Sequence, residues 1–556
     1  ELRQKKEDLQ VLSYDDLLLR LQESLQNGDQ GQKLADKLRE KYPLALVDEF
    51  QDTDPSQYDI FRRIYQPDTE QSGLFMIGDP KQSIYSFRGA DVFSYLKAKR
   101  DAPEEQTHGL DYNFRSTPEM IASINRLFGS HSKPFILDDI SFEPVKSGKE
   151  KSAYDWLEEK GKPQVPIRFR RLSSGEYEQL YKGNAAEKAS KDTAREINRL
   201  IEGGKQGAIT IGSDAVKAKD IAVLVRTHRQ AHQMSEALRE HDIKSVQYSQ
   251  ESVFKSEEAR QLQTFLKAIA EPANETLIKT ALSLPLTGYQ AHQLLEIEED
   301  EARWMQVLDQ FDQWHQRWQD KGFAAMFRSV LQQASIAGHL MKYQDGERRL
   351  TNLLHLGELL QEEAQQHHEG ARGLLKWLTR KRKEDDGQQD EEQLRLESDE
   401  ELVKIVTMHR SKGLEYPIVF CPYLWHGPEL SDNGQPLVYH DPDNLDRTYL
   451  DINGKSDPDR DRKRQLTARE ELAESLRLAY VAMTRAEQCC YLTWTYAKKS
   501  EFSPLGYLLL EPEKVFDEMQ QTITDSYNAI GRQPFEKKIE ALCDNHSKLF
   551  TIQESQ

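Results

Sequence analysis

Two short apolar runs near the start of the chain are each followed at once by polar and turn-forming residues. Leu44–Val47 ends at the adjacent carboxylates Asp48 and Glu49, and residues 74–77 end at Gly78. Runs of this length predict buried strands, and open α/β sheets place their ligands at the carboxyl ends of parallel strands. The pattern therefore predicts two strands whose ends carry chemistry.

The middle of the chain alternates between strand and helix patterns. Residues 166–172 and 221–226 are strand-like runs, residues 193–202 between them have helical spacing, and a further strand-like run covers residues 403–407. Such alternation predicts an α/β fold with a parallel sheet. Residues 146–162 are charged and poorly patterned, so we expect a loop there.

A long helical segment interrupts this alternation. Ser256 is a suitable helix cap, and helical spacing continues from it to about Thr379. The apolar residues of the first helix recur at this spacing: Leu262, Phe265, Leu266 and Ile269. We therefore predict an all-helical inserted domain, in which Trp304, Trp314 and Trp318 are packing residues. Residues 380–400 are charged and of low complexity, which predicts a flexible return.

Length and composition limit the class of protein. At 556 residues the chain is too long for a single core and predicts about three or four domains. No apolar run approaches the roughly 20 residues of a membrane span, and the start does not resemble a secretory signal, so we expect a cytoplasmic protein with no membrane partner. The four cysteines, Cys421, Cys489, Cys490 and Cys543, predict reduced core thiols rather than a disulfide framework.

Asp48 and Glu49 suit the hydrolysis of a nucleotide. Because Mg²⁺ takes one or two carboxylates and keeps several waters, Asp48 can hold the water shell of the metal while Glu49 orients or deprotonates the attacking water. A solvated strand end would explain the same pair. The second turn favours the nucleotide site, because Gly78 frees the backbone and Gln82 can bridge a terminal phosphate to the turn.

Five segments, in this order along the chain, resemble the motifs of superfamily 1A DNA helicases, the relatives of UvrD, Rep and PcrA. They are VDEFQDTDPSQ from Val47, IGDPKQSIYSFRGAD from Ile77, LDYNFRS from Leu110, IVTMHRSKGLE from Ile405 and RLAYVAMTRA from Arg477. The sequences of these motifs are most similar to those of the RecB family of helicase-nucleases (exodeoxyribonuclease V). The resemblance implies two RecA-like parallel-sheet motor domains with an all-helical insert.

The same resemblance implies a division of the chain into domains. The expected parts are the end of a helical accessory (1B-like) domain at 1–40, part of the first motor domain at 41–105, the second motor domain at 106–255 and 401–510, a helical (2B-like) insert with a charged linker at 256–400, and a linker toward a further C-terminal domain at 511–556.

The resemblance also implies ATP and Mg²⁺ as cofactors and assigns roles around them. Asp48 would hold Mg²⁺, Glu49 would act on water and Gln82 would sense the γ-phosphate. The expected contacts from the second motor domain are Phe114 against the adenine, Arg115 on the γ-phosphate, Glu415 on the ribose hydroxyls, Gly413 allowing a close backbone approach, and Arg485 as an arginine finger.

A second set of residues is implied to contact DNA. Tyr85 and Phe87 would stack on bases, although core packing would also explain them and the family more often has Trp in place of Phe87. Arg88 would couple DNA to nucleotide, and His409 and Lys412 would lie near the DNA or phosphates. The net charge of −19 disfavours a polyanion partner, but one narrow basic channel is enough to grip a strand.

A glycine-rich phosphate loop, G-x-x-x-x-G-K-[ST], is absent from the sequence. We therefore expect a piece of a longer protein that hydrolyses little ATP by itself, with any nuclease domain in further sequence. The resemblance implies the motor section of a 3′–5′ ATP-dependent DNA helicase acting in double-strand break repair and recombination, on single-stranded and duplex DNA, with RecC-like and RecD-like subunits. A UvrD- or AddA-type repair helicase and an ATPase-dead DNA-binding scaffold stay open as alternatives.

Overall fold

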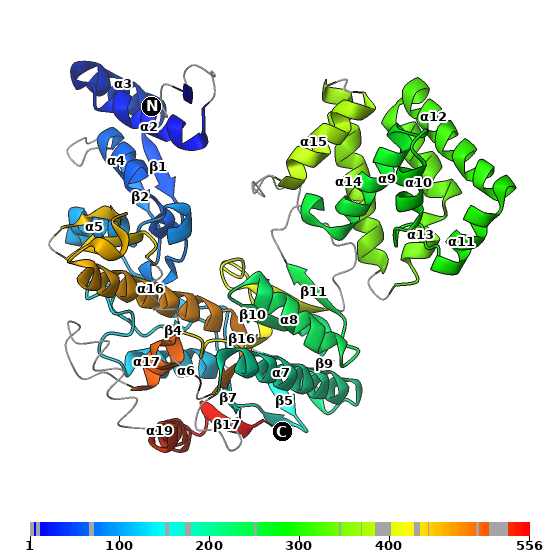
Figure 1. The fold of residues 1–556 in the computed structure, drawn as a ribbon. Helices are drawn as coiled ribbons and strands as arrows, with labels where there is room; N and C mark the ends of the chain where they lie inside the picture. The colour runs from blue at the N-terminus through cyan, green and yellow to red at the C-terminus, as the bar shows by residue number, and fades with distance from the viewer. Residues whose placement is uncertain are drawn as a thin grey trace. The chain divides into compact units, whose positions relative to one another are not determined.

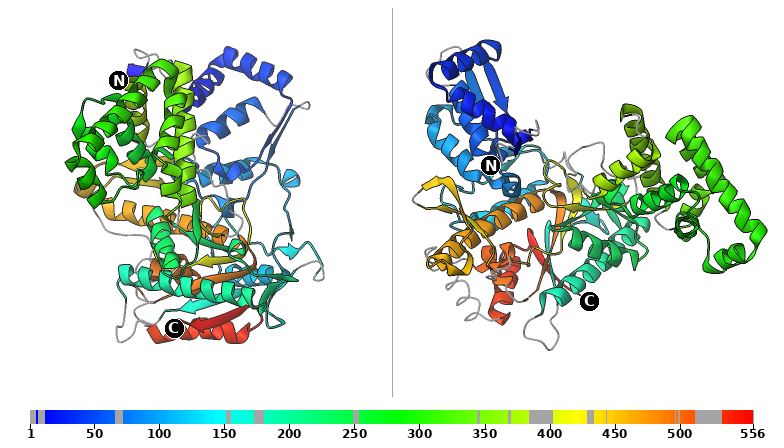
Figure 2. Two further views of the ribbon diagram at one scale, coloured as in Figure 1. Left: turned by 90° about the vertical axis from the view of Figure 1, so that its right-hand side faces the viewer. Right: turned by 45° about the horizontal axis from the view of Figure 1, so that its top comes forward.

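The computed structural model describes residues 5–6, 12–65, 72–150, 155–172, 180–248, 253–343, 346–367, 370–383, 402–427, 434–442, 444–495, 497, 500–510 and 532–555. The chain divides into two compact units, Glu1–Gln247 with Leu402–Gln556 (unit 1) and Tyr248–Glu401 (unit 2). Within unit 1 we distinguish a first lobe, residues 12–106, from a second lobe that holds the rest. Figures 1 and 2 show the first lobe in blue at one end of unit 1 and the C-terminal strand in red toward the other.

The first lobe is a two-stranded parallel sheet with helices. Its elements are α2 (Tyr14–Leu25), α3 (Gly28–Lys41), β1 (Leu44–Val47), η1 (Phe50–Asp52), α4 (Pro55–Ile64), β2 (Gly73–Met76), η2 (Pro80–Gln82), η3 (Ser86–Arg88), α5 (Val92–Asp101) and η4 (Glu104–Gln106). Leu44 of β1 lies opposite Gly73 of β2, which places the two strand ends and their turns side by side. Both predicted strands are therefore present, and their polar ends meet.

The expectation that these two strands are buried is wrong. Successive side chains of a strand point to opposite faces, and only one face of this pair is covered. Val47 and Met76 pack against the core residues Phe50 and Tyr58. On the other face, Leu46 is 70% exposed and Phe75 is 56% exposed, because the described residues supply only two strands and no layer on that side.

The second lobe is built on the predicted parallel sheet, with strand order β11-β12-β10-β13-β16-β7-β17. The strands are β7 (Ile167–Arg171), β10 (Ile221–Val225), β11 (Ser245–Tyr248), β12 (Val403–Thr407), β13 (Tyr416–Cys421), β16 (Ala486–Trp494) and β17 (Phe550–Glu554). The helices are α6 (Pro118–Gly129), α7 (Lys182–Lys205), α8 (His228–Arg239), α16 (Arg460–Met483), α17 (Pro504–Leu510) and α19 (Arg532–Asn545). Within this main sheet, the register is described for five strand pairs, and all five are parallel. Together they join the part of the lobe that precedes unit 2 to the part that follows it.

Smaller sheets border the main one and correct two predictions. The expected loop at 146–162 contains β4 (Lys146–Ser147), β5 (Leu157–Glu159) and part of β6 (Lys162–Pro163); β4 pairs with β3 (Tyr112–Asn113), and β5 and β6 join a sheet with β8 (Ile209–Ile211) and β9 (Asp214–Ala215). The expected linker at 511–556 contains a helix, α19, and a strand, β17. It is more than a linker, because β17 extends the main sheet beside β7. Residues 511–531 of that expected linker lie outside the described residues.

A hairpin, β14 (Leu437–Asp441) with β15 (Asn444–Asp451), precedes α16 and packs on it. The core of the second lobe includes the buried, free thiols of Cys421, Cys489 and Cys490, and Cys543 is also buried and free, which confirms the prediction of reduced core cysteines.

From Val253 on, unit 2 is all helical in its described residues, as predicted. Its elements are η7 (Val253–Lys255), α9 (Glu257–Ala270), α10 (Glu275–Leu282), α11 (Ala291–Glu299), α12 (Glu301–Gln333), α13 (Ile336–Leu340), α14 (Gly346–His367) and α15 (Ala371–Lys383). Ser256 caps α9, since its hydroxyl accepts a hydrogen bond from the N–H of Ala259. Trp314 and Trp318 are buried in the core of this unit and Trp304 packs against it, so the packing prediction is confirmed. Residues 384–401 of the predicted flexible return lie outside the described part.

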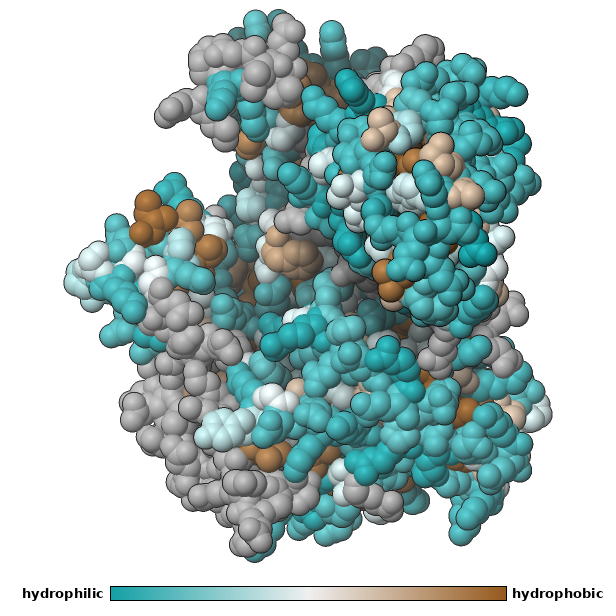
Figure 3. Space-filling view, turned by 45° about the vertical axis from the view of Figure 1, so that its right-hand side comes forward, coloured by the Kyte–Doolittle hydropathy of each residue, from teal (hydrophilic) through white to brown (hydrophobic). Residues whose placement is uncertain are grey.

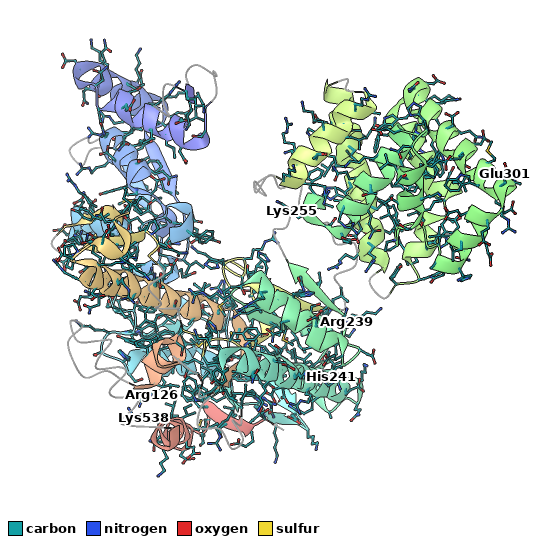
Figure 4. All side chains as sticks on the ribbon, in the orientation of Figure 1. Arg126, Arg239, His241, Lys255, Glu301 and Lys538 are labelled. Carbon is teal, nitrogen blue, oxygen red and sulfur yellow. The ribbon has the colours of Figure 1, made fainter. Side chains whose placement is uncertain are left out.

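On the face shown in Figure 3, the coloured residues are mostly hydrophilic, with scattered apolar groups. Long basic side chains such as Arg239 at the end of α8 and Lys538 on α19 lie on it (Figure 4). Of the helices that the structure describes, none combines the length and the apolar character needed to cross a bilayer.

Candidate active site

The turn after β1 presents both carboxylates of the predicted acidic pair. Asp48 is exposed, and its Oδ1 accepts a hydrogen bond from the N–H of Glu49 at 2.9 Å. Glu49 adopts a left-handed backbone conformation (φ 51°, ψ 38°), which is uncommon for a residue with a side chain and costs on the order of 1 kcal/mol. Both carboxylates thus lie on one strained turn directly after β1.

The turn after β2 is tied to this one by Gln51, which is fully buried. Its Oε1 accepts a hydrogen bond from the N–H of Asp79 at 2.9 Å, and its Nε2 donates to Glu49 Oε2 at 2.5 Å. Gly78 makes this approach possible, because a Cβ there would lie 2.5 Å from Gln51 Oε1. Gln51 was not among the predicted site residues; a polar residue directly after the apolar Phe50 in the same motif is the signal that could have identified it.

Gln82 and Asp79 lie on the same turn of the first lobe. Gln82 Nε2 donates to Asp79 Oδ2 at 3.1 Å, and Lys81 Nζ lies 2.8 Å from Asp79 Oδ1. Asp79 also caps η2, since its side chain accepts from the N–H of Lys81. The predicted phosphate sensor is therefore held by a capped turn beside Gln51 and Glu49.

Lys412 of the second lobe joins the two lobes at the acidic turn. Its side chain is 6% exposed, its Nζ lies 2.9 Å from Glu49 Oε2, and it forms a second ion pair with Asp52. Gly413, at φ 81°, turns the chain immediately after it in a conformation that favours glycine. Lys412, which we expected near DNA or phosphates, is thus paired with the carboxylate expected to act on water.

These contacts shift the acidity of both carboxyls. Burial tends to raise the pKa of Glu49, but hydrogen bonds from Lys412 and Gln51 outweigh it, so its pKa lies below the usual value. Burial raises the pKa of Asp52 despite Lys412. Asp52 Oδ1 is buried and has no hydrogen-bond partner among the described residues. Lys412 therefore keeps Glu49 ionised and compensates only part of the burial cost of Asp52.

The loop that carries Phe114 and Arg115 is fixed by Asn113, whose Oδ1 accepts from the N–H groups of Arg115 and Ser116 at 2.9 and 3.0 Å. The Phe114 ring is 59% exposed and lies over the backbone of Gly148, where a Cβ would come within 2.6 Å of three ring carbons. This arrangement leaves an aromatic ring available for a base. Arg115 Nε donates to Glu415 Oε2 at 2.9 Å, which brings together two residues expected to contact nucleotide.

Arg485 is 2% exposed and lies at the end of α16. Its guanidinium donates to the carbonyls of Val481 (3.0 Å) and Leu414 (3.2 Å). Burial, together with the neighbouring positive charge of Arg115, lowers its pKa to about 10, while Glu49 acts in the opposite direction. Glu49, Arg115 and Arg485 are therefore close enough to interact electrostatically across the two lobes.

The aromatic residues expected to contact DNA form one cluster. The Tyr85 ring lies 5.9 Å from Phe87 and 6.2 Å from His409, and Phe87 meets His409 edge-on at 5.1 Å. The Tyr85 hydroxyl donates to the carbonyl of His409 at 3.0 Å, and Lys412 Nζ lies 5.4 Å from the Tyr85 ring centre. Phe87 is exposed and Tyr85 partly so. The side chain of Arg88 lies outside the described part of the structure.

Metal ligands are few in this region. Within the part of the chain that the structure describes, no three His, Cys, Asp or Glu side chains form a metal-binding group. A magnesium ion held mainly by phosphate and water needs only one or two carboxylates, and Asp48 has an exposed carboxylate of this kind. Asp48 therefore fits a nucleotide-bound magnesium ion rather than a metal site made by protein alone.

Comparison with known proteins agrees with this geometry. Residues 109–497 match the family of UvrD-like helicase C-terminal domains, and residues 1–103 match the family of UvrD/REP helicase N-terminal domains. The chain is 38% identical to the RecBCD enzyme subunit RecB of Escherichia coli (strain K12) over 488 residues, which cover 86% of this chain and 40% of the relative. It is 37% identical to that of Haemophilus influenzae over 510 residues (91% and 40%) and 32% identical to that of Mycobacterium tuberculosis (strain ATCC 25618 / H37Rv) over 503 residues (89% and 43%).

The chain thus spans about 40% of the length of these relatives. Both family matches meet between residues 103 and 109, where the first lobe passes into the second. The parallel sheet and the contact between motif residues of the two lobes agree with these matches. The chain therefore belongs to the UvrD-like helicase family.

Proposed function

We propose that this chain is the motor section of an ATP-dependent DNA helicase that moves 3′ to 5′ along one strand, within a RecBCD-type helicase-nuclease acting in double-strand break repair and recombination. The observation that carries the proposal is the seam between the lobes, where Glu49 of the first lobe pairs with Lys412 of the second and interacts with Arg485, which has Arg115 beside it. Catalytic acids and arginines on separate lobes suit a motor whose lobes close on a nucleotide.

ATP with Mg²⁺ would supply the phosphoryl group whose hydrolysis drives movement. Asp48 would hold the metal through its exposed carboxylate, and Glu49, kept ionised by Lys412, would accept a proton from the attacking water. Arg115 and Arg485 would neutralise negative charge from across the seam, with Phe114 against the base. Arg115 must then leave Glu415, so nucleotide binding would exchange this ion pair for one with phosphate.

Single-stranded DNA would contact the cluster of Tyr85, Phe87 and His409. Stacking on an aromatic ring tolerates any base and contributes about 1–3 kcal/mol per base, which suits a motor that moves along all sequences. Because Tyr85 touches both His409 and Lys412, a base that shifts Tyr85 would also disturb the ion pair on Glu49. This contact offers a direct route from DNA binding to hydrolysis.

The relatives are subunits of the RecBCD enzyme, which supports a proposal about partners. We propose RecC-like and RecD-like subunits as partners, with single-stranded and duplex DNA as substrates, in the cytoplasm.

DNA-stimulated ATP turnover of the full-length protein tests the proposal. We expect Glu49→Gln to lower turnover by about 10² to 10⁴, the usual contribution of a positioned base, and to leave binding of single-stranded DNA intact. Glu240→Gln, which changes an exposed carboxylate at the end of α8, is the matched control and should behave as wild type. Turnover of Glu49→Gln within about threefold of wild type would contradict the assignment of the base. If the wild type bound DNA but turned over no ATP, the protein would instead be a DNA-binding scaffold.

A further inference from the structure

A buried histidine of the β14–β15 hairpin, His440, contacts both α16 and the first lobe. The backbone N–H of His440 donates to Glu470 Oε1 of α16 at 2.7 Å, and its Nδ1 lies 3.0 Å from Glu470 Oε2. On the other side, its Nε2 lies 3.7 Å from Asp91 Oδ1, and its ring centre lies 4.3 Å from that of Phe93. Asp91 and Phe93 belong to the first lobe, so this side chain bridges α16 and α5.

Asp91 also ties the start of α5 to the acidic turn of the first lobe. Asp91 caps α5, because its Oδ1 accepts from the N–H of Phe93 at 2.9 Å. Its own N–H donates to the carbonyl of Thr53 at 3.2 Å, directly after Asp52 in the acidic turn. Asp91 therefore lies where the loop of residues 83–88, α5 and the acidic turn come together.

One face of α16 contacts both His440 and the loop of residues 83–88. Glu470, Glu474 and Arg477 follow each other at spacings of four and three residues, which places them on the same side of a helix. Glu470 binds His440, Glu474 Oε1 accepts from the hydroxyl of Ser86 at 2.5 Å, and Arg477 Nε donates to the carbonyl of Ser83 at 2.7 Å. The helix that ends next to Arg485 thus lies along the whole loop of residues 83–88.

The charges at the contact favour a protonated imidazole. Burial alone would lower the pKa of His440, but hydrogen bonds and charge from Asp91 and Glu470 raise it to about 9. The facing charged groups are Asp91 from α5, Glu470 from α16 and, further along α16, Arg477, which interacts with both carboxylates. Thr448 of β15 adds a neutral hydroxyl 3.1 Å from Nε2. At neutral pH a cation therefore lies between two carboxylates from different lobes.

We propose that the β14–β15 hairpin is an interlobe clamp, with His440 as its positioning residue, which holds the loop of residues 83–88 against α16 so that DNA binding at Tyr85 and Phe87 is transmitted along α16 to Arg485. The inference rests on the proposed helicase function and adds a residue outside the helicase motifs. The clamp gives the two lobes a preferred closed arrangement.

Three variants of the full-length protein test the clamp. His440→Gln removes the charge, His440→Lys keeps a cation, and Asp91→Asn removes the partner charge while its amide oxygen can still cap α5. His228→Gln, at an exposed histidine of α8, is the matched control. The measurements are ATP turnover with and without single-stranded DNA, DNA affinity, and amide hydrogen exchange in peptides covering β14–β15 and α5.

We expect His440→Gln and Asp91→Asn each to lower DNA-stimulated kcat about fivefold or more, a typical size for coupling between sites. Unstimulated turnover and DNA affinity should stay at wild-type values, the double variant should lose no more than either single one, and His440→Lys should recover part of the loss. Hydrogen exchange should rise in α5 as well as in the hairpin. The wild-type stimulation should fall between pH 8 and pH 10, as His440 loses its proton, and that of His440→Gln should not.

The clamp would be overturned if DNA stimulated ATP turnover in both His440→Gln and Asp91→Asn as strongly as in wild type and with the same pH dependence. Faster exchange confined to the hairpin would also overturn it. These outcomes differ from failure of the helicase proposal, in which the wild type itself would turn over no ATP. Hydrogen exchange in α5 would still test the clamp in that case. Should His440→Gln fail to fold, Asp91→Asn gives the same comparison.

Discussion

Lys412 Nζ lies 2.9 Å from Glu49 Oε2, so a cation from the second lobe neutralises the carboxylate that follows the first strand of the chain. The same ammonium group binds Asp52 and faces the ring of Tyr85. One side chain therefore contacts the proposed base, a half-buried acid and the aromatic cluster proposed to bind DNA.

Lys412→Met should destabilise the protein by about 2 kcal/mol, because it leaves the 18% exposed side chain of Asp52 without a cation. Urea denaturation of the protein at neutral pH measures the loss. Lys191→Met removes an exposed ion pair with Glu187 on α7 and should change stability by less than about 0.5 kcal/mol. Equal effects of the two variants would show that the seam is not formed in solution. The same Lys412→Met protein should also need a higher pH for ATP turnover, since Lys412 lowers the pKa of Glu49.

His440→Gln should lose stability in a pH-dependent way. The pKa of His440 is raised to about 9 in the folded protein, so its contribution is fully present below the unfolded value of about 6.5 and disappears as the pH rises through 9. We expect the variant to be less stable than wild type by about 2 kcal/mol at pH 6, with a difference that vanishes near pH 10. Denaturant midpoints across this range measure it, and a constant difference would show that the histidine is uncharged.

Gly148→Ala should weaken nucleotide binding while leaving the fold intact. The new Cβ would lie 2.5 Å from the Phe114 ring, which is exposed and can rotate away. We expect KM for ATP to rise about threefold to tenfold, with kcat nearly unchanged, because stacking on the base is lost in ground state and transition state alike. Gly183→Ala in α7, where nothing lies within 4 Å, is the control and should leave KM unchanged. An unchanged KM in Gly148→Ala would remove Phe114 from the nucleotide site.

Tyr85→Ala should weaken binding of single-stranded DNA by about 5- to 100-fold, the worth of one stacked base. Tyr85→Phe loses the hydrogen bond to the carbonyl of His409. Because it keeps the stacking ring, it should bind DNA like wild type. Fluorescence anisotropy with a labelled oligonucleotide measures both, and Tyr289→Ala in unit 2 serves as an exposed control. Equal affinities of Tyr85→Ala and wild type would mean that the ring only packs the protein.

The sequence by itself determined the local elements and the places where chemistry could occur. The alternation of apolar runs and helical spacing predicted β7, α7, β10 and β12, and the helical pattern predicted unit 2, because these patterns reflect which side of each element is buried. The motifs placed Glu49, Arg115 and Arg485 at strand and helix ends, where side chains of an α/β fold reach a ligand.

Only the tertiary structure decided which of these side chains meet. The exposed face of β1 and β2 and the addition of β17 to the main sheet depend on which strands are neighbours, which a local pattern does not encode. The pairing of Lys412 with Glu49 and Asp52, and of His440 with Asp91 and Glu470, joins segments from distant parts of the sequence. Such contacts arise when two lobes close on each other, and the energy of a buried charge depends on the partners that closure supplies.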